Sequence, residues 1–265
     1  MNILLKGGLF ITKLDGKVAV VTGAASGMGK AIATLYGENG ANVVAADFNF
    51  EGAEAVASEI NDAGGSALAV SVNVTERVQV ESMIDTAIDA FGDLNILVNN
   101  AGIMDSFEPV GEITDEKWDQ IFDVNTKGVM RAMRKAINYW VDNDKEGTIV
   151  NTISTGGLNG AHAGVAYGAS KHAAVALTKN TGWMYAKKGI RVNGIAPGSI
   201  ETNIGSSMKD ISEFGMERAG MTHGLSPRIG QAGEVAEAAL FLGSDASSFV
   251  NGTILTVDGG WTAGF

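Results

Sequence analysis

Short runs of apolar residues alternate along the chain with longer segments whose apolar positions recur every three to four residues. The short runs are rich in β-branched side chains and predict seven strands, at residues 18–22, 42–47, 67–73, 94–99, 148–153, 191–196 and 253–257. The longer segments predict helices at residues 30–39, 51–63, 77–91, 114–140, 166–187 and 234–242, with a break in the fourth near 125–128.

This alternation is typical of an α/β fold. The connections are long enough for helical crossovers, which predicts a doubly wound, parallel, seven-stranded sheet with helices on both faces. With 265 residues and no linker or repeat, the chain is expected to form a single domain over residues 1–265. Residues 199–227 are rich in Gly, Ser and Met and weakly periodic, so we expect them to form a lid over the substrate.

Composition narrows the class of protein. The absence of cysteine excludes a disulfide framework and a Cys nucleophile, and it fits a reducing, cytoplasmic location. The net charge of −11 disfavours nucleic acid as a partner. No apolar run is long enough for a membrane span, and no His, Asp and Glu cluster suggests a metal. Residues 1–13 are expected to be a short leader rather than a signal peptide.

A glycine-rich turn joins the first predicted strand to the first helix. Gly23, Gly27 and Gly29, with Ser26 and Met28 between them, allow a sharp turn and a close approach of main-chain amides to a pyrophosphate. The amino end of the following helix would add N–H donors. The same glycines also fit a tight turn without a ligand.

Asp47 ends the second predicted strand, 18 residues after Gly29. An acidic residue about 20 residues beyond the glycine turn is placed to accept hydrogen bonds from the adenosine ribose. It would repel a 2′-phosphate by roughly a few kcal/mol. No basic residue lies beside it, so the sequence favours NAD over NADP; the alternative is a solvated carboxylate at a strand end.

Tyr167 and Lys171 lie four residues apart, on one face of a predicted helix. A phenol has a pKa of about 10, and a neighbouring ammonium lowers such a pKa by roughly 1–3 units, which makes a usable general base. Ser154 follows a predicted strand, where α/β proteins bind their ligands. A Tyr-x-x-x-Lys pair by itself is common by chance.

Together these motifs make the chain similar to the short-chain dehydrogenase/reductase family, in its single-domain branch with a Rossmann-like fold, over about residues 14–260. The motifs occur in family order: the glycine turn at 22–29, Asn-Asn-Ala-Gly at 99–102, Asn125, Ser154 with Tyr167 and Lys171, Pro-Gly at 197–198, and Asp-Gly-Gly at 258–260.

The resemblance implies catalytic roles for four residues. Tyr167 would be the general acid/base, and Lys171 would lower its pKa and bind the nicotinamide ribose. Ser154 would orient the substrate oxygen. Asn125 would break its helix and hold a water that links Lys171 to solvent.

The resemblance also implies the contacts to NAD. They are Gly23, Ser26, Gly27, Met28, Gly29, Asp47, Asn73, Val74, Asn100, Ala101, Gly102, Tyr167, Lys171, Pro197, Gly198, Ile200 and Thr202. Thr202 would bond the carboxamide. Asn73 stands where the family more often has Asp, and its carbonyl oxygen is expected to bond the adenine amino group.

Substrate contacts are expected from Met104, Gly156, His162 and Met208 and from the lid. Methionines form adaptable apolar walls, which favours a small or medium, mainly apolar ketone or secondary alcohol. Two alternatives stay open: the apolar lid residues only pack the lid against the body, and His162 is a solvated loop residue.

The resemblance implies a homotetramer, with a dimer as second choice. Met133, Ile137, Trp140, Trp183 and Met184 are expected to supply its apolar surface.

The leading hypothesis is an NAD-dependent oxidoreductase that interconverts a secondary alcohol and a ketone, with Tyr167 as acid/base. The alternative enzyme is a reductase of 3-oxoacyl thioesters on acyl carrier protein; its usual demand for NADPH conflicts with Asp47. A non-catalytic nucleotide-binding regulatory protein is the alternative from another class, and it has no need for the four catalytic residues.

Overall fold

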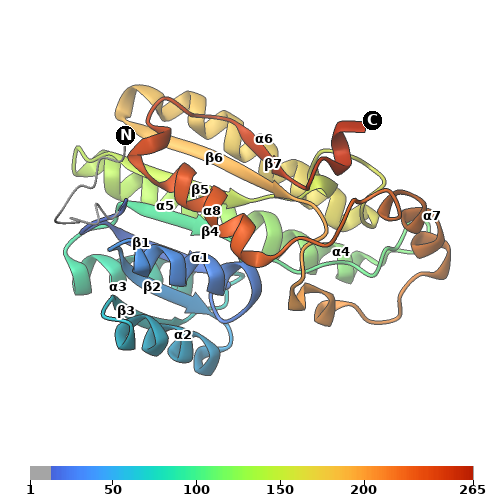
Figure 1. Ribbon diagram of the computed structural model, residues 1–265. Helices are drawn as coiled ribbons and strands as arrows, with labels where there is room; N and C mark the ends of the chain where they lie inside the picture. Colours follow the sequence, from blue (N-terminus) through green and yellow to red (C-terminus); the bar gives the residue numbers. More distant parts are fainter. Residues whose placement is uncertain (1–12, 265) are drawn as a thin grey trace, which may run out of the picture.

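The computed structural model describes residues 13–264, so the expected leader lies almost wholly outside the described residues. A parallel sheet in the strand order β3-β2-β1-β4-β5-β6-β7 forms the centre (Figure 1). Its strands are β1 (Val18–Thr22), β2 (Asn42–Asp47), β3 (Ser66–Ser71), β4 (Ile96–Asn99), β5 (Gly147–Thr152), β6 (Ile190–Pro197) and β7 (Ile254–Val257).

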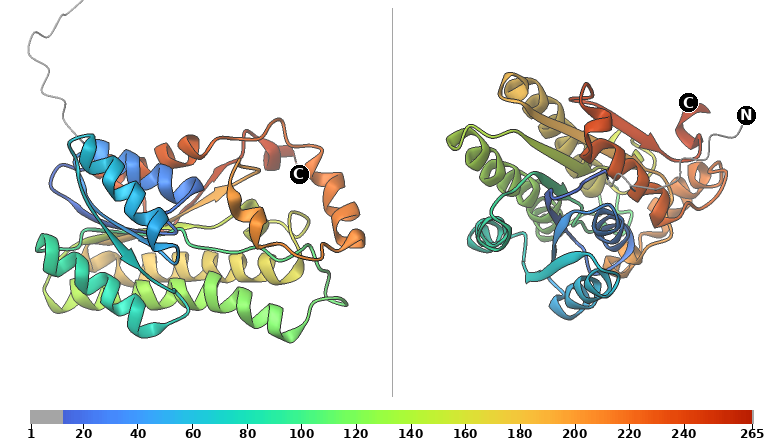
Figure 2. Two further views of the ribbon diagram at one scale, coloured as in Figure 1. Left: turned by 90° about the horizontal axis from the view of Figure 1, so that it is seen from below. Right: turned by 60° about the vertical axis from the view of Figure 1, so that its left-hand side comes forward.

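Helices cover both faces of this sheet (Figure 2). On one face lie α1 (Gly27–Glu38), α2 (Phe50–Asp62) and α8 (Ala232–Gly243), and on the other α3 (Arg77–Phe91), α5 (Val129–Asp142) and α6 (Val165–Tyr185). The order reverses between β1 and β4, so the predicted doubly wound fold is confirmed. The carboxyl ends of strands at such a reversal form the crevice in which α/β proteins bind ligands.

Alternate residues of each strand enter different cores. Ala19 and Val21 of β1 pack with α1 and α8, while Val18 and Val20 pack with α3 and α5. Side chains of a strand point to opposite faces in turn, so a sheet buried on both faces needs apolar residues at every position. This explains why the strands read as continuous apolar runs.

The predicted ends of β1, β2 and α3 agree with the structure. The strand predicted from residue 94 begins instead at Ile96, although the main chain of Asn95 already bonds both neighbouring strands: its N–H donates to the Val18 carbonyl and its carbonyl accepts the N–H of Thr148, each at 2.9 Å. The Leu94 N–H donates to its neighbour Asp93 (2.8 Å), and Asn95 Oδ1 accepts the N–H of Val18 (2.7 Å).

The segment 199–227 contains a helix that the apolar pattern did not reveal, α7 (Glu213–His223). Ser212 caps its amino end by accepting the N–H of Gly215 at 2.9 Å. Only Ala219 of α7 is buried, so the helix has no apolar stripe from which the sequence pattern could have predicted it. Figure 1 shows α7 beyond the carboxyl ends of the strands.

Within residues 13–264, no helix is both long and apolar enough to cross a membrane. The same part of the chain contains no group of three His, Asp or Glu side chains placed to hold a metal ion.

Candidate active site

Ser154, Tyr167 and Lys171 meet just beyond the carboxyl end of β5. Ser154 and the phenol of Tyr167 line the same cavity, and Ser154 acts to lower the pKa of the phenol. Ser154 Oγ also accepts the N–H of Gly156 at 3.0 Å. Lys171 lies one turn further along α6, with Nζ 5.6 Å from the centroid of the Tyr167 ring. Its ammonium donates to the carbonyl of Thr152 at 2.8 Å, which holds it beneath the phenol. The three predicted residues therefore form one constellation.

Burial dominates the pKa values of Tyr167 and Lys171, because desolvation disfavours the charged form of each side chain. Burial is the main reason why the pKa of Tyr167 rises to about 12; the charge of Asp105 also raises it, and hydrogen bonding by Ser154 lowers it. Burial lowers the pKa of Lys171 to about 8. The site thus holds a strongly bound phenolic proton beside a weakly bound ammonium proton.

Asn125 lies in a π-helical turn, Asp123–Gly128, between α4 (Asp115–Phe122) and α5. The break predicted near 125–128 is therefore present. Its Oδ1 accepts the N–H of Ile103 at 3.0 Å, and its Nδ2 donates to the Ile103 carbonyl (2.9 Å) and to Ser170 Oγ (3.1 Å). Asn125 thus ties the loop after β4 to α6. Both its amide hydrogens are used by protein groups, and its water-holding role stays a prediction.

A cleft of about 830 Å³ opens at the carboxyl ends of β1, β2 and β4. Eleven of the predicted cofactor contacts line it: Gly23, Ser26, Gly27, Met28, Asp47, Asn73, Val74, Asn100, Ala101, Gly102 and Thr202. Four others, Tyr167, Pro197, Gly198 and Ile200, line an adjoining cavity. Gly29 and Lys171 line neither the cleft nor the adjoining cavity.

The glycine turn fits a dinucleotide. Gly23 has φ +68°, and a Cβ on it would lie 2.9 Å from the Cα of Ala101. A Cβ on Gly29 would lie 1.9 Å from the carbonyl oxygen of Gly23. The turn therefore packs more tightly than any side chain allows. The Ser26 side chain leaves the amino end of α1 uncapped, so its N–H groups suit a pyrophosphate.

Asp47 is fixed at the rim of this cleft. Its carboxylate accepts the N–H of Ala25 and the N–H of Asn49, both at 2.9 Å. The described walls of the cleft include Glu116, Asp119 and Asp123 but no Lys or Arg. A 2′-phosphate would meet carboxylates without a compensating cation.

Asn73 differs from the expectation. Its Oδ1 accepts both the N–H of Thr75 at 3.0 Å and the Thr75 hydroxyl at 2.9 Å. A carbonyl oxygen has two lone pairs, and a short polar side chain commonly closes such a local turn. In this conformation the oxygen has no acceptor site left for an adenine amino group, although Asn73 lines the cleft.

Ser154 and Tyr167 line the adjoining cavity, which has a volume of about 200 Å³ and many apolar side chains in its walls. Its walls include Ser154 and Tyr167 together with Met104, Phe107, Ile153, Ile204, Met208 and Trp261. It shares Met28, Thr202 and Ile204 with the larger cleft. Of the predicted substrate residues, Met104, His162 and Met208 line it. Gly156 lies behind Ser154, where a Cβ would approach Ser154 Oγ at 3.4 Å.

His162 is buried, which rules out the solvated-loop interpretation. Its ring stacks on Trp261 with centroids 4.1 Å apart, and its carbonyl lies 3.1 Å from Nε2 of His223. Burial, and then the charge of His223, lower the pKa of His162. The ring is therefore a neutral part of the cavity wall at neutral pH.

Phe107, His223 and Trp261 line the same cavity and were not among the predicted substrate residues. They come from three segments that only the folded lid brings together. His223 contacts Phe107 and Trp261 edge-on, at centroid distances of 5.7 and 5.3 Å. No local spacing signals such a cluster.

Three of the five residues expected to supply apolar interface surface are buried instead. Met133, Ile137 and Trp140 are buried in the core between α5 and the sheet, since the apolar stripe of α5 faces inward. Trp183 and Met184 do remain exposed, by 79% and 60%. In the lid, Met208 faces the cavity but Phe214 and Met221 face solvent.

Comparisons with known proteins agree with this architecture. A family model described as enoyl-(acyl carrier protein) reductase matches residues 23–262. A 3β-hydroxysteroid dehydrogenase of Eggerthella lenta is 45% identical over 250 residues, covering 94% of this chain and 96% of the relative. A 3-oxoacyl-[acyl-carrier-protein] reductase of Thermotoga maritima is 35% identical, over 94% of this chain and 98% of the relative.

Among solved structures, levodione reductase superposes with a TM-score of 0.87 at 32% identity, over 95% of this chain and 100% of that chain. The similarity in sequence and structure extends over almost the entire chain. The protein belongs to the short-chain dehydrogenase/reductase family, oxidoreductases that use NAD or NADP.

Proposed function

We propose that this oxidoreductase is an NAD-dependent dehydrogenase that interconverts a secondary alcohol and its ketone, with Tyr167 as general acid/base. The observation that carries the proposal is the pairing of Ser154 with the phenol of Tyr167 at an apolar cavity. That cavity adjoins a cleft whose rim holds Asp47 and whose described walls lack Lys and Arg.

In this mechanism the substrate oxygen binds between Ser154 Oγ and the phenolic oxygen of Tyr167. Tyrosinate takes the hydroxyl proton during oxidation and returns it during ketone reduction. NAD, when bound, supplies the hydride acceptor for the carbinol carbon. Lys171 stabilises the tyrosinate through its ammonium, which Thr152 holds in place. Ser154 donates to the substrate oxygen and holds it within hydrogen-bond reach of the phenolic oxygen.

The cavity supports an apolar, alicyclic substrate. Its walls include three Met, three Ile, one Phe and one Trp side chain, and no described Lys or Arg lies there to bind a carboxylate. Ligand pockets usually measure about 300–1,000 Å³, so a cavity of about 200 Å³ would enclose only the ring that bears the reacting hydroxyl. The Eggerthella relative is a hydroxysteroid dehydrogenase, and we propose a hydroxyl on a steroid or similar ring system.

A 3-oxoacyl-thioester reductase is the second candidate, and the Thermotoga relative favours it. Asp47 and the acidic cleft wall argue against the NADPH that such a reaction usually demands. A non-catalytic nucleotide-binding protein has no use for the buried Ser154–Tyr167–Lys171 constellation.

We propose a homotetramer, for which Trp183 and Met184 supply exposed apolar surface. The absence of cysteine supports a cytoplasmic location.

Initial rates with NAD and with NADP test the proposal, using hydroxysteroids, cyclic and linear secondary alcohols, and 3-hydroxyacyl thioesters. We expect turnover of cyclic alcohols with NAD, and a loss of at least ~10²-fold in Tyr167→Phe. The control is thermal unfolding of the variant. Wild-type turnover by Tyr167→Phe would refute the mechanism, and a preference for thioesters with NADPH would favour the second candidate.

A further inference from the structure

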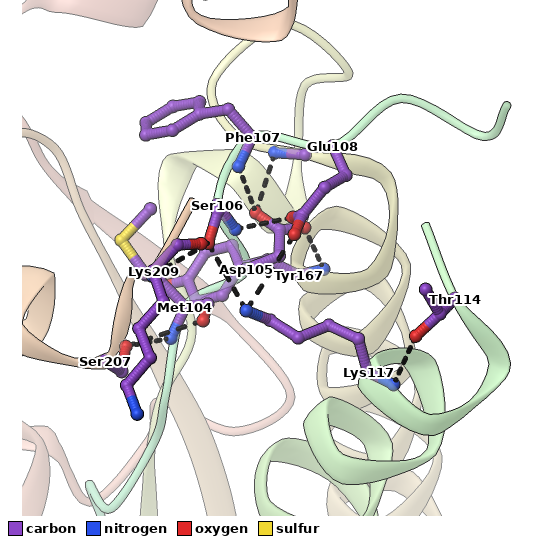
Figure 3. A network of polar contacts seen from close by, with 11 residues as sticks. Met104, Asp105, Ser106, Phe107, Glu108, Thr114, Lys117, Tyr167, Ser207 and Lys209 are labelled. Carbon is purple, nitrogen blue, oxygen red and sulfur yellow. Dashed lines mark hydrogen bonds and ion pairs between the residues drawn. The ribbon is translucent and has the colours of Figure 1, made fainter. Parts of the chain in front are cut away.

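Asp105 is a fully buried carboxylate in the loop that follows β4, outside the motifs of the active site. It accepts three main-chain N–H groups, from Phe107 at 3.3 Å, Gly164 at 3.1 Å and Tyr167 at 2.8 Å (Figure 3). Two of these donors belong to the amino end of α6. The third lies in the loop of Asp105 itself, so one side chain joins the loop to the helix.

The amino end of α6 is built to receive this carboxylate. Gly164 occupies the cap position of α6 and has no side chain to accept the first N–H groups of the helix. Asp105 supplies the missing acceptor from a distant part of the chain, where the helix dipole also favours a negative charge. A Cβ on Gly164 would lie 2.5–2.6 Å from the carboxylate atoms, so the glycine keeps the space that Asp105 fills.

The residues on either side of the bridge belong to the active site. Tyr167, whose N–H is bound, carries the phenol that faces Ser154. Met104 and Phe107 flank Asp105 and line the apolar cavity. Phe107 has φ +63°, a conformation that is strained for a bulky residue and persists only where its surroundings hold it.

The same loop is bonded to the lid (Figure 3). Ser106 Oγ donates to the carbonyl of Lys209 at 2.6 Å, and the Ser106 carbonyl accepts the N–H of Ser212 at 2.9 Å. The Met104 N–H donates to Ser207 Oγ at 3.0 Å. Loop and lid therefore form one wall of the cavity, and Asp105 is the side chain that joins this wall to α6.

We propose that Asp105 is a positioning residue for the dehydrogenase reaction: it joins the wall of the substrate cavity to α6 and so fixes the Tyr167 phenol relative to the substrate oxygen. This inference rests on the proposed function, because the phenol must be the acid/base for its position to matter. Misplacing a reacting group by about 1 Å can cost about 10²-fold in rate.

Charge gives Asp105 an effect that a purely structural residue lacks. Burial raises its pKa against the lowering by its three N–H donors, and its negative charge raises the pKa of Tyr167. The other titratable groups around the phenol and this carboxylate are Lys171 on α6, Glu108 in the loop, Lys117 on α4, His162 before α6 and His223 on α7. Removing the charge of Asp105 therefore lowers the pKa of Tyr167.

The test is Asp105→Asn, which keeps the shape but sets an amide donor against at least one main-chain N–H. We expect kcat/KM for alcohol oxidation to fall about 10- to 100-fold while NAD binding persists. The acid limb of the pH profile should move to lower pH. The matched control is Glu108→Gln: the Glu108 side chain bonds Ser106 and Lys117, whereas α6 is bonded by its main-chain carbonyl, which accepts the N–H of Val165 at 2.9 Å and is kept in the variant.

Gly164→Ala disturbs the same contact from the side of α6, and it is the test to use if Asp105→Asn does not fold. It should lower kcat/KM in the wild type but add little in an Asp105→Ala background, because the clash is then gone. Additive losses, or an acid limb that stays in place in a folded Asp105→Asn variant, would overturn the inference. If Tyr167→Phe is inactive and Asp105→Asn is normal, only the positioning role fails; if Tyr167→Phe is active, the proposed function fails as well.

Discussion

At the scale of single residues, the active site is controlled by burial. Tyr167 and Lys171 are each almost fully buried, so each resists its charged form, with a pKa of about 12 for the phenol and about 8 for the amine. In the proposed mechanism the ammonium of Lys171 and the phenolate of Tyr167 stabilise each other.

Replacing Lys171 by Met should move the pH profile in the opposite direction from Asp105→Asn. The loss of the ammonium raises the pKa of Tyr167, so alcohol oxidation, which needs the tyrosinate, should require a higher pH. Profiles of kcat/KM against pH measure the shift, with the exposed Lys187→Met as control. An acid limb that does not rise in Lys171→Met would contradict the proposed pairing.

Asp47 sets a separate prediction about the cofactor. The double variant Asp47→Ser, Phe48→Arg removes a carboxylate and adds a cation at the rim of the cleft. The ratio of kcat/KM for NADP to that for NAD should rise at least ~10-fold, since charge repulsion at contact is roughly a few kcal/mol. Activity with NAD should also fall, because Asp47 supports the N–H of Ala25 in the glycine turn. An unchanged ratio would show that another group selects the cofactor.

At the scale of elements, function depends on where helices begin. The uncapped amino end of α1 faces the cleft, whereas that of α6 is capped by a carboxylate from another loop. Both ends need a glycine: a Cβ on Gly29 would meet the main chain of Gly23, and a Cβ on Gly164 would meet the carboxylate of Asp105.

Gly29→Ala tests the packing of α1 against the glycine turn. Its Cβ would fall 1.9 Å from the carbonyl oxygen of Gly23, so the turn must move and NAD affinity should drop at least ~10-fold. Calorimetric titration with NAD measures this. Gly233→Ala in α8 is the matched control: nothing lies within 4 Å of its Cβ, and it should stabilise the fold by up to about 1 kcal/mol. Normal NAD binding by Gly29→Ala would refute the claim that the tight packing of the glycine turn is needed to bind the dinucleotide.

At the scale of the whole molecule, the two ends of the sheet have different tasks. The carboxyl ends hold the cleft and the cavity. At the opposite end, Asp93 accepts bonds from the N–H of Leu94 (2.8 Å), the hydroxyl of Tyr139 (2.9 Å) and Lys145 Nζ (3.1 Å). This cluster joins the start of β4 to the end of α5, at the end of the sheet opposite the cleft.

Asp93→Asn should therefore lower stability without changing kcat. Burial alone would raise the pKa of Asp93, but its hydrogen bonds and Lys145 outweigh this and lower it. A carboxylate whose pKa is lowered by folding stabilises the folded state fully at pH values above its unfolded-state pKa of about 3.9. This contribution is lost as the pH falls through the folded-state pKa. Urea unfolding should show a loss of about 1 kcal/mol at pH 7 that shrinks towards pH 2. A loss independent of pH would contradict this account.

The sequence by itself determined the alternation of strands and helices, the glycine turn and the Tyr167–Lys171 pair. These features are local: strand and helix periods and the spacing of one helical turn act over a few residues. The ends of β1, β2 and α3 and the break around Asn125 were predictable for the same reason.

Only the tertiary structure decided which distant segments meet. It brings Asp105 to the N–H of Tyr167, 62 residues further along the chain, and stacks Trp261 on His162. It also turned Met133 inward and closed Asn73 Oδ1 onto Thr75. Such contacts depend on strand order and on the path of the lid, and neither leaves a short-range pattern because the partners lie on separate elements.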